Sequence, residues 1–209
     1  MTLINLTIED FSTEVASNKP APGGGSVSAL MANLGTALTR MVGALTITKK
    51  RFLRLDEEIK QEFNNNLEAI KTIQEQLKIL IDEDTKAYNK IVAAFKIPKD
   101  NEERQEKIKK ATIAAIEVPL EILRLALKAL TKIPVILKYG NPNAISDLGV
   151  AALALSSGAE GGAMNVLINL IGFEDETLKA KYQSKTTSLI TEVREIKEII
   201  LTKVYQELA

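Results

Sequence analysis

The hydrophobic pattern of residues 55–95 restricts the possible fold of this 209-residue chain more than any other feature. Apolar residues recur there with a period close to 3.6, the repeat of an α-helix. They are Leu55, Ile59, Phe63, Leu67, Ile70, Ile73, Leu77, Leu80, Ile81, Tyr88, Ile91, Val92 and Phe95. No alternating β pattern and no long internal repeat is visible anywhere in the chain. The sequence therefore predicts an all-α fold.

Further helices are predicted on both sides of this segment. They cover 7–16, 25–47, 101–138, 145–172 and 177–208. Pro119 is expected to kink the third of these helices, and Pro134 to kink it again near its end. Gly158, Gly161 and Gly162 are expected to divide the fourth into two short helices. The prediction is a single domain over 1–209, built as a multi-helix bundle of six to eight helices.

The charged and reactive residues narrow the possible function. Basic and acidic residues are balanced at 27 each, so the positive field of a nucleic-acid or membrane-surface protein is missing. The chain has no cysteine and no histidine. Acid/base chemistry would therefore fall to carboxylates, lysine or tyrosine, and no metal site is expected. The sequence therefore favours a protein that acts on a small molecule.

The start of the chain and the apolar segment that follows bear on location and assembly. Thr7, Glu9 and Asp10 come too early for a signal peptide, which favours the cytoplasm. The segment 26–46 is long enough to span a bilayer, but it is rich in small residues, so no membrane span is predicted. Small residues suit close helix packing, either inside the bundle or between subunits. We expect a homodimer built around helix 25–47.

A proline- and glycine-rich loop feeds that apolar helix. Pro22, Gly23, Gly24 and Gly25 precede Ser26, which is predicted to be the N-cap. The free amides at such a helix start suit a carboxylate, a phosphate or the edge of a heterocycle. Alternatively, the glycines only make a sharp turn and let helices cross closely. The loop lacks the Gly-Lys-Ser/Thr ending of a phosphate-binding Walker sequence.

Two aspartates in the long helical segment are predicted to lie on different faces of the helix. Asp84 falls four residues after Leu80 and four before Tyr88, so it stands on the core-facing stripe. Asp82 falls on the polar face. A carboxylate on an apolar stripe is desolvated, and its pKa is usually raised. Asp84 is therefore the candidate acid/base, and a buried aspartate that bonds a neighbouring helix is the alternative interpretation.

Two further groups of polar residues are candidates for binding. Asn165 and Asn169 share one face of a strongly apolar helix, where their amides could read a heterocycle edge or tie two helices together. Lys49, Lys50 and Arg51 follow helix 25–47 and could hold an anionic ligand tail or simply complement a helix end.

Several of these motifs resemble the cyclodeaminase domain of the formiminotransferase-cyclodeaminase family. The resembling segments are Phe11 to Ser17, Pro20 to Leu30, Met41-Val42 with Lys49-Lys50, Asp82 to Tyr88, Gly140-Asn141, Ser146 to Ala152 and Gly162 to Leu170. They occur in order over essentially the whole chain. The resemblance implies an all-helical, dimerising fold with a folate site near the glycine-rich segment. It also implies a formimidoyltetrahydrofolate cyclodeaminase or a methenyltetrahydrofolate cyclohydrolase.

The resemblance assigns expected roles to individual residues. Asp84 is implied to be catalytic, with Asp82 as the other possibility within the same motif. A tetrahydrofolate derivative is the expected substrate, and no further cofactor is expected. The residues implied to bind it are Pro22, Gly23, Gly24, Gly25, Ser26, Lys49, Lys50, Asp147, Asn165 and Asn169. The competing hypothesis is a non-catalytic helical scaffold that binds folate or only itself.

Overall fold

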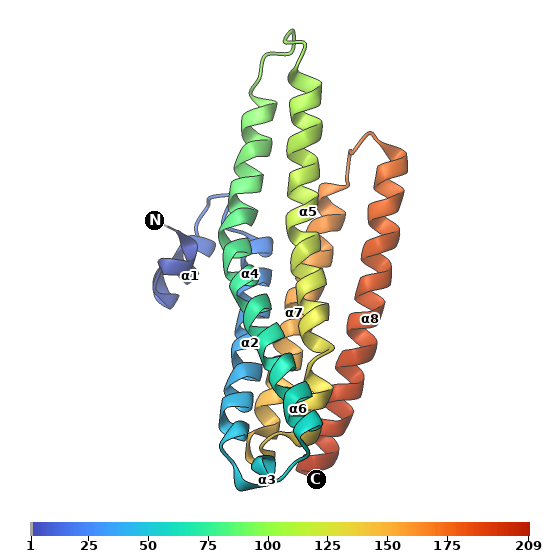
Figure 1. Cartoon of the computed structure of the whole chain (residues 1–209). Helices are drawn as coiled ribbons and strands as arrows, with labels where there is room; N and C mark the ends of the chain where they lie inside the picture. The colour runs from blue at the N-terminus through green and yellow to red at the C-terminus, as the bar shows by residue number, and fades with distance from the viewer. Residues whose placement is uncertain (1) are drawn as a thin grey trace.

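Every regular element in residues 2–209, the range described by the computed structural model, is helical (Figure 1). The α-helices are α1 (Ile8–Val15), α2 (Gly24–Ile47), α3 (Lys50–Leu53), α4 (Glu57–Phe95), α5 (Arg104–Leu130), α6 (Ile133–Tyr139), α7 (Ile145–Asn169) and α8 (Glu176–Leu208). Two short 3-10 helices are η1 (Leu3–Asn5) and η2 (Pro142–Ala144). The all-α prediction is confirmed, and the number of helices falls within the predicted six to eight.

The long helices form a bundle in which α2 and α7 pack directly against each other. Figure 1 shows α4 and α5 side by side and rising above the start of α2, with α8 along the other side of the bundle. The core lies where these helices meet. Its fully buried side chains include Phe63, Leu77, Ile116, Leu123 and Leu155. Removing one such side chain from water contributes about 1.5–3 kcal/mol, so this shared core holds the helices in place.

The stripe predicted for residues 55–95 matches the buried face of α4 between Phe63 and Ile81, whereas Phe95 at its end is 56% exposed. Phe63, Ile70, Ile73, Leu77 and Ile81 are all at most 1% exposed. The short helix α3 between α2 and α4 was not predicted. Its Phe52 is buried and its ring lies 4.8 Å from that of Phe63, so this turn closes the lower end of the bundle.

The prediction of two short helices in 145–172 is wrong, because α7 runs without a break to Asn169. Its glycines serve packing between helices. A Cβ on Gly158 would lie 2.6 Å from the main-chain oxygen of Ser28, and one on Gly162 would lie 2.9 Å from that of Pro119. Glycine at these positions lets α2 and α5 approach the backbone of α7. The glycines of α7 thus act between helices and leave the helix itself intact.

The predicted helix 101–138 is instead two helices. α5 ends at Leu130, and α6 begins at Ile133 with Pro134 in its first turn. A proline fits a first helical turn because the amide it lacks has no partner there. Pro119 stands inside α5, which continues past it. Pro134 therefore marks a helix start and not a kink.

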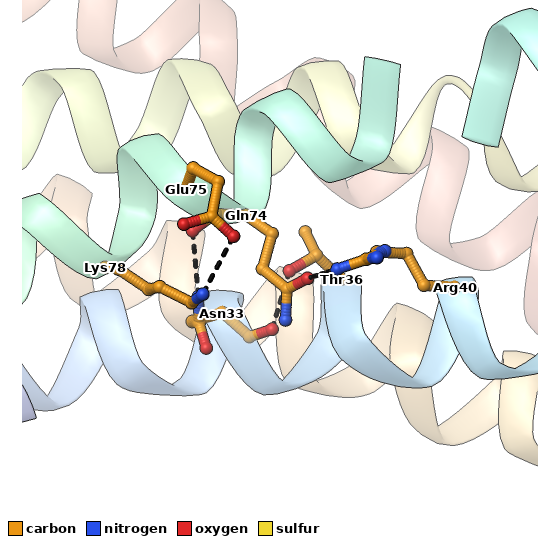
Figure 2. Close-up of polar contacts among 6 residues, drawn as sticks. All are labelled: Asn33, Thr36, Arg40, Gln74, Glu75 and Lys78. Atoms are coloured by element: carbon orange, nitrogen blue, oxygen red, sulfur yellow. Dashed lines mark hydrogen bonds and ion pairs between the residues drawn. The ribbon is translucent and has the colours of Figure 1, made fainter. Parts of the chain in front are cut away.

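A buried polar network joins α2 to α4 (Figure 2). Asn33 donates from Nδ2 to the main-chain oxygen of Gln74 at 3.0 Å, and Arg40 donates to the Gln74 side chain at 2.5 Å. Asn33 and Gln74 are 6% and 8% exposed. A shift of α2 along α4 would leave these buried amides without hydrogen-bond partners, which costs free energy of folding. The network therefore fixes the position of α2 along α4.

Helix α2 is long and apolar enough to cross a membrane by length and composition alone. In the bundle, its small residues face other helices. A Cβ on Gly35 would lie 2.7 Å from Cγ of Leu155, on α7. The close packing foreseen for this helix is therefore made inside the bundle, against α7.

Candidate functional site

The carboxylate of Asp84 on α4 lies against the first turn of α2. The main-chain N–H of Ser26 donates to Asp84 Oδ2 at 3.1 Å, and the Ser26 hydroxyl lies 3.5 Å from the same oxygen. A Cβ on Gly25 would overlap the carboxylate. Glycine at position 25 is therefore what allows an α4 carboxylate to reach the helix start.

Ser26 is not the N-cap, as the sequence had suggested. Gly23, in an extended conformation, caps α2, and Ser26 is already the third helical residue. Its hydroxyl donates to the main-chain oxygen of Ile81 at 2.7 Å and lies 3.3 Å from Oγ1 of Thr85. Ser26 is fully buried, so it locks the first turn of α2 onto α4.

Burial changes the acidity of Asp84. Desolvation raises the pKa of its carboxyl above the ordinary aspartate value, and the hydrogen bonds from Ser26 offset only part of that rise. Asp84 is half-buried, so part of the residue remains accessible. A partly accessible carboxyl with a raised pKa is suited to accept and return a proton.

The amide of Asn165 approaches the same helix start from α7. A Cβ on Gly24 would lie 3.0 Å from Asn165 Nδ2, so the side chain contacts the glycine directly. Nδ2 donates to the Gly161 oxygen at 2.8 Å, and Oδ1 accepts no hydrogen bond from residues 2–209. The Asn165 oxygen therefore remains available to a ligand donor.

Asn169 has a different role from its neighbour on the same face. Its Nδ2 donates to the main-chain oxygen of Ala115 at 2.7 Å and so ties α7 to α5. Of the two interpretations given for this asparagine pair, the tying of two helices therefore applies to Asn169. Asn169 joins helices, and Asn165 faces the start of α2.

The glycine-rich loop presents backbone donors at this point. The N–H groups of Gly24 and Gly25 have no hydrogen-bond partner within residues 2–209. Pro22 before them is buried, and its peptide bond to Ala21 is cis. Free amides at the positive end of a helix favour an electron-rich or anionic group.

Asp82 is occupied elsewhere. Its carboxylate accepts from the N–H of Leu3 at 2.6 Å and from that of Ile4 at 3.4 Å. It therefore holds the N-terminal 3-10 helix against α4. Asp82 was predicted on the polar face, but the N-terminal 3-10 helix covers it and leaves it half-buried like Asp84, so the two aspartates differ in what they contact and not in exposure.

Lys49, Lys50 and Asp147 do not join this group within one chain. The 24 residues of α2 span about 35 Å, and Lys49 lies beyond its far end. Asp147 is in the first turn of α7, and shortly before that helix the Asn141 N–H donates to Oγ1 of Thr46, at the end of α2, at 2.9 Å. These three residues therefore gather at the opposite end of the bundle from Asp84.

Thr85 also lies near the site, although the sequence did not single it out. Its contact with Ser26 depends on the crossing of two helices, and no local pattern indicates it. Within residues 2–209, no three His, Cys, Asp or Glu side chains group as a metal site. The site thus combines a carboxyl of raised pKa, two free amides and a free amide oxygen, which is a suitable set for a polar heterocycle.

Comparison with known proteins identifies relatives over nearly the whole chain. A sequence profile of the formiminotransferase-cyclodeaminase family matches residues 7–188. A methenyltetrahydrofolate cyclohydrolase from Methylorubrum extorquens is 32% identical over 200 residues, which cover 94% of this chain and 94% of that protein. The formimidoyltransferase-cyclodeaminase of Rattus norvegicus is 32% identical over 203 residues, which cover 95% of this chain but 37% of that protein.

A solved structure shares the fold. The formiminotetrahydrofolate cyclodeaminase of Thermotoga maritima matches with a TM-score of 0.80 at 26% identity, covering 98% of this chain and 96% of that one.

Proposed function

This chain belongs to the formiminotransferase-cyclodeaminase family, and on that premise we propose that it is a cytoplasmic folate one-carbon enzyme with Asp84 as its acid/base. It acts at the bridge between N5 and N10 of tetrahydrofolate, as a cyclodeaminase or a cyclohydrolase. The observation that carries the assignment is the Asp84 carboxyl, whose pKa is raised by burial beside the free amides of Gly24 and Gly25. Residues 1–209 act as one catalytic domain.

In the cyclohydrolase direction, the substrate carries a cationic N5–C–N10 amidinium bridge. Ionised Asp84 stabilises this cation and accepts a proton from the water that attacks the bridge carbon. The carboxyl then returns this proton to N5 as the bond between N5 and carbon breaks, and the hydroxyl of the intermediate releases its proton to solvent as the C=O of the N10-formyl group forms. The raised pKa brings the acid and base forms of Asp84 closer in free energy, which suits a group that must act as both.

In the cyclodeaminase direction, N10 attacks the formimino carbon on N5. Ammonia must leave, and protonated Asp84 supplies the proton that the departing amine needs. The product is the same methenyl bridge that the cyclohydrolase opens. One carboxyl can therefore serve both reactions, and no other titrating side chain is required.

Backbone and amide groups around Asp84 bind the heterocycle. The N–H groups of Gly24 and Gly25 donate to it, and Asn165 Oδ1 accepts from its amino or ring N–H groups. Pro22, Gly23 and Ser26 hold these amides in place by fixing the start of α2. Asn169 supports the site indirectly by tying α7 to α5.

A homodimer would bury an apolar surface that one subunit leaves open. We define the α2–α7 patch as Leu34, Met41, Leu45, Val150 and Leu153, each of which is 39–53% exposed. Gly35 packs against Ala151 and Leu155 of the same chain. The α2 residues and the α7 residues of the patch therefore lie at similar positions along the bundle axis. A two-fold contact through this patch would bury it, and with the two-fold axis perpendicular to α2 the two α2 helices would lie antiparallel.

Such a dimer would also complete the site. With antiparallel α2 helices, the C-terminal end of α2 in one subunit lies beside the first turn of α2 in the other. Within one chain these two ends are separated by the full length of the helix. Lys49, Lys50 and Asp147 of the partner subunit would then lie near Asp84. The lysines would meet the added carboxylates of a polyglutamate tail.

Two separate assays test the enzyme assignment. The purified protein is supplied with methenyltetrahydrofolate in one and with 5-formimidoyltetrahydrofolate in the other, and methenyl absorbance and released ammonia are followed. We expect turnover of at least one substrate. Folate binding without turnover of either would favour the non-catalytic scaffold instead.

A further inference from the structure

The N-terminal helix α1 leaves its apolar face open. The Asp10 N–H donates to the side chain of the capping residue Thr7 at 3.0 Å, which fixes the start of this helix. None of its eight residues is buried, and Ile8 is 88% exposed. Figure 1 shows α1 standing beside the start of α2, at the edge of the bundle. A helix this short is not stable alone in water, so α1 requires more packing than its own chain supplies.

An apolar groove of about 470 Å³ lies between α1 and the bundle. Phe11 and Val15 line it from α1, Val27 and Leu30 line it from α2, and Ile81 lines it from α4. Apolar side chains that entered the groove would remove all of these walls from water. The groove is therefore suited to bind an apolar segment of a protein.

The α2 wall of the groove continues into the α2–α7 patch. Val27, Leu34 and Met41 follow one another at intervals of seven residues, and Leu45 lies 18 residues after Val27. Seven residues make about two helical turns and 18 make about five, so these side chains share one side of α2. In the antiparallel dimer proposed above, a two-fold axis at the middle of this row would place Val27 opposite Leu45 of the partner subunit. The groove would then receive the end of the partner's α2 and the α3 turn that follows it.

The two surfaces that would meet carry opposite charges. Helix α1 contains three acidic residues and no basic one, whereas segment 49–54 around α3 contains four basic residues and no acidic one. None of these four cations forms an ion pair within residues 2–209. Between the basic residues, the Leu53 side chain is 59% exposed. The segment thus matches the groove in both charge and apolar character.

We propose that α1 is an arm that clasps a second copy of this chain, with Leu45 and Leu53 of the partner subunit in the groove beside α1. The proposal rests on the homodimer proposed above and goes beyond it by giving α1 a function between subunits. The same segment carries Lys49 and Lys50 of the partner subunit. The clasp therefore also holds these lysines near Asp84.

Cross-linking tests the clasp, because the chain has no cysteine of its own. Ser12 is exposed and lines the groove, so Ser12→Cys combined with Leu45→Cys places one thiol on each side of the proposed contact. A short bismaleimide should join the two positions only between subunits, since Leu45 lies about 27 Å along α2 from the groove wall at Val27. Ser12→Cys with Ile199→Cys, on α8, is the matched control and should give no covalent dimer.

Dimer affinity gives a second readout that does not depend on an introduced thiol. Ile8→Ser should raise the dimer Kd about tenfold or more, because a side chain exposed in one chain becomes buried in the clasp. Ile199 is 58% exposed, and Ile199→Ser should leave Kd unchanged. Sedimentation over a dilution series measures Kd, and circular dichroism checks that both variants are folded.

The outcomes separate the clasp from the other proposals. A covalent dimer through positions 12 and 45, together with the raised Kd of Ile8→Ser, is the expected result. A dimer by light scattering that gives no such cross-link, or equal Kd values for the two serine variants, would overturn the clasp and leave the homodimer standing. A monomer would overturn both. No measurement here needs folate turnover, so the enzyme assignment depends on the two assays described above.

Discussion

At the scale of single residues, the proposed catalytic position of Asp84 carries a cost to stability. Its carboxyl is desolvated between α4 and the first turn of α2, and no cation among residues 2–209 forms an ion pair with it. Groups tuned for proton transfer commonly stabilise a protein less than an uncharged replacement would. The same burial that raises the pKa should therefore be measurable as lost stability.

Replacing Asp84 with Asn should stabilise the fold at neutral pH by about 1 kcal/mol, or roughly 3 °C in Tm. The folded pKa of Asp84 is raised, so the folded state binds its proton more tightly than the unfolded chain does. Wild-type stability is then lost as pH rises from the unfolded aspartate pKa of about 3.9 through the folded value. Thermal melts from pH 3 to 8 check this, and the advantage of Asp84→Asn should disappear at the acidic end. An advantage that stayed constant with pH would contradict the burial argument.

The sequence could locate Asp84 but not the true role of Ser26. The helical period of α4 is a long, regular signal, and it places Asp84 on the buried stripe and Asp82 off it. The start of α2 depends on Gly23 and on contacts with Ile81 and Asp84, which lie far away in the chain. A local capping rule therefore put Ser26 at the wrong helical position.

At the scale of elements, close contact of α2 with α7 sets the geometry of the site. The crossing brings Asn165 to Gly24, while the network of Asn33 and Gln74 holds α2 along α4 (Figure 2). Glycines in α7 make this approach possible. From sequence they suggest a broken helix, because what they contact belongs to another part of the chain.

Replacing Gly158 with Ala should destabilise the bundle. The new methyl would lie 2.6 Å from the main-chain oxygen of Ser28, so α2 would have to shift away from α7, at a cost of about 1–3 kcal/mol that exceeds the gain in helix propensity. Gly149→Ala in the same helix is the control, since its methyl would meet only the Val204 side chain at 3.1 Å. Urea denaturation measures both variants. Equal stability of the two would show that α7 does not need glycine at position 158.

At the scale of the whole molecule, the site residues divide between the two ends of the bundle. The Pro22 to Ser26 loop, Asp84 and Asn165 meet at one end, and Lys49, Lys50 and Asp147 lie at the other. Sequence motifs give the order of residues along the chain but not the distances between them in space. The resemblance to a folate enzyme could therefore not reveal this separation. Helix lengths and the antiparallel packing of α2 and α7 do reveal it, and they make a second subunit part of the functional hypothesis.

Subunit complementation tests that hypothesis. An Asp84→Asn subunit and a subunit with Lys49→Glu and Lys50→Glu are each expected to be impaired with polyglutamylated substrate. Co-expressed, they should form mixed dimers with one intact site, which would return up to about a quarter of wild-type sites at random assembly. Activity no higher than the mean of the two parents would mean that the lysines do not act across subunits, and a monomer by light scattering would exclude the dimer itself.

The most direct test of the account compares Asp84→Asn with Asp82→Asn in the hydrolysis of methenyltetrahydrofolate. Asp84→Asn should lower kcat about 100-fold with little change in KM, and it should abolish the rise in kcat/KM that wild type shows as pH increases through the raised pKa of Asp84. Asp82→Asn should keep both kcat and that pH dependence, since Asp82 only holds the N-terminal 3-10 helix. Wild-type kcat in Asp84→Asn, or equal losses in the two variants, would contradict the assignment of Asp84 as the acid/base.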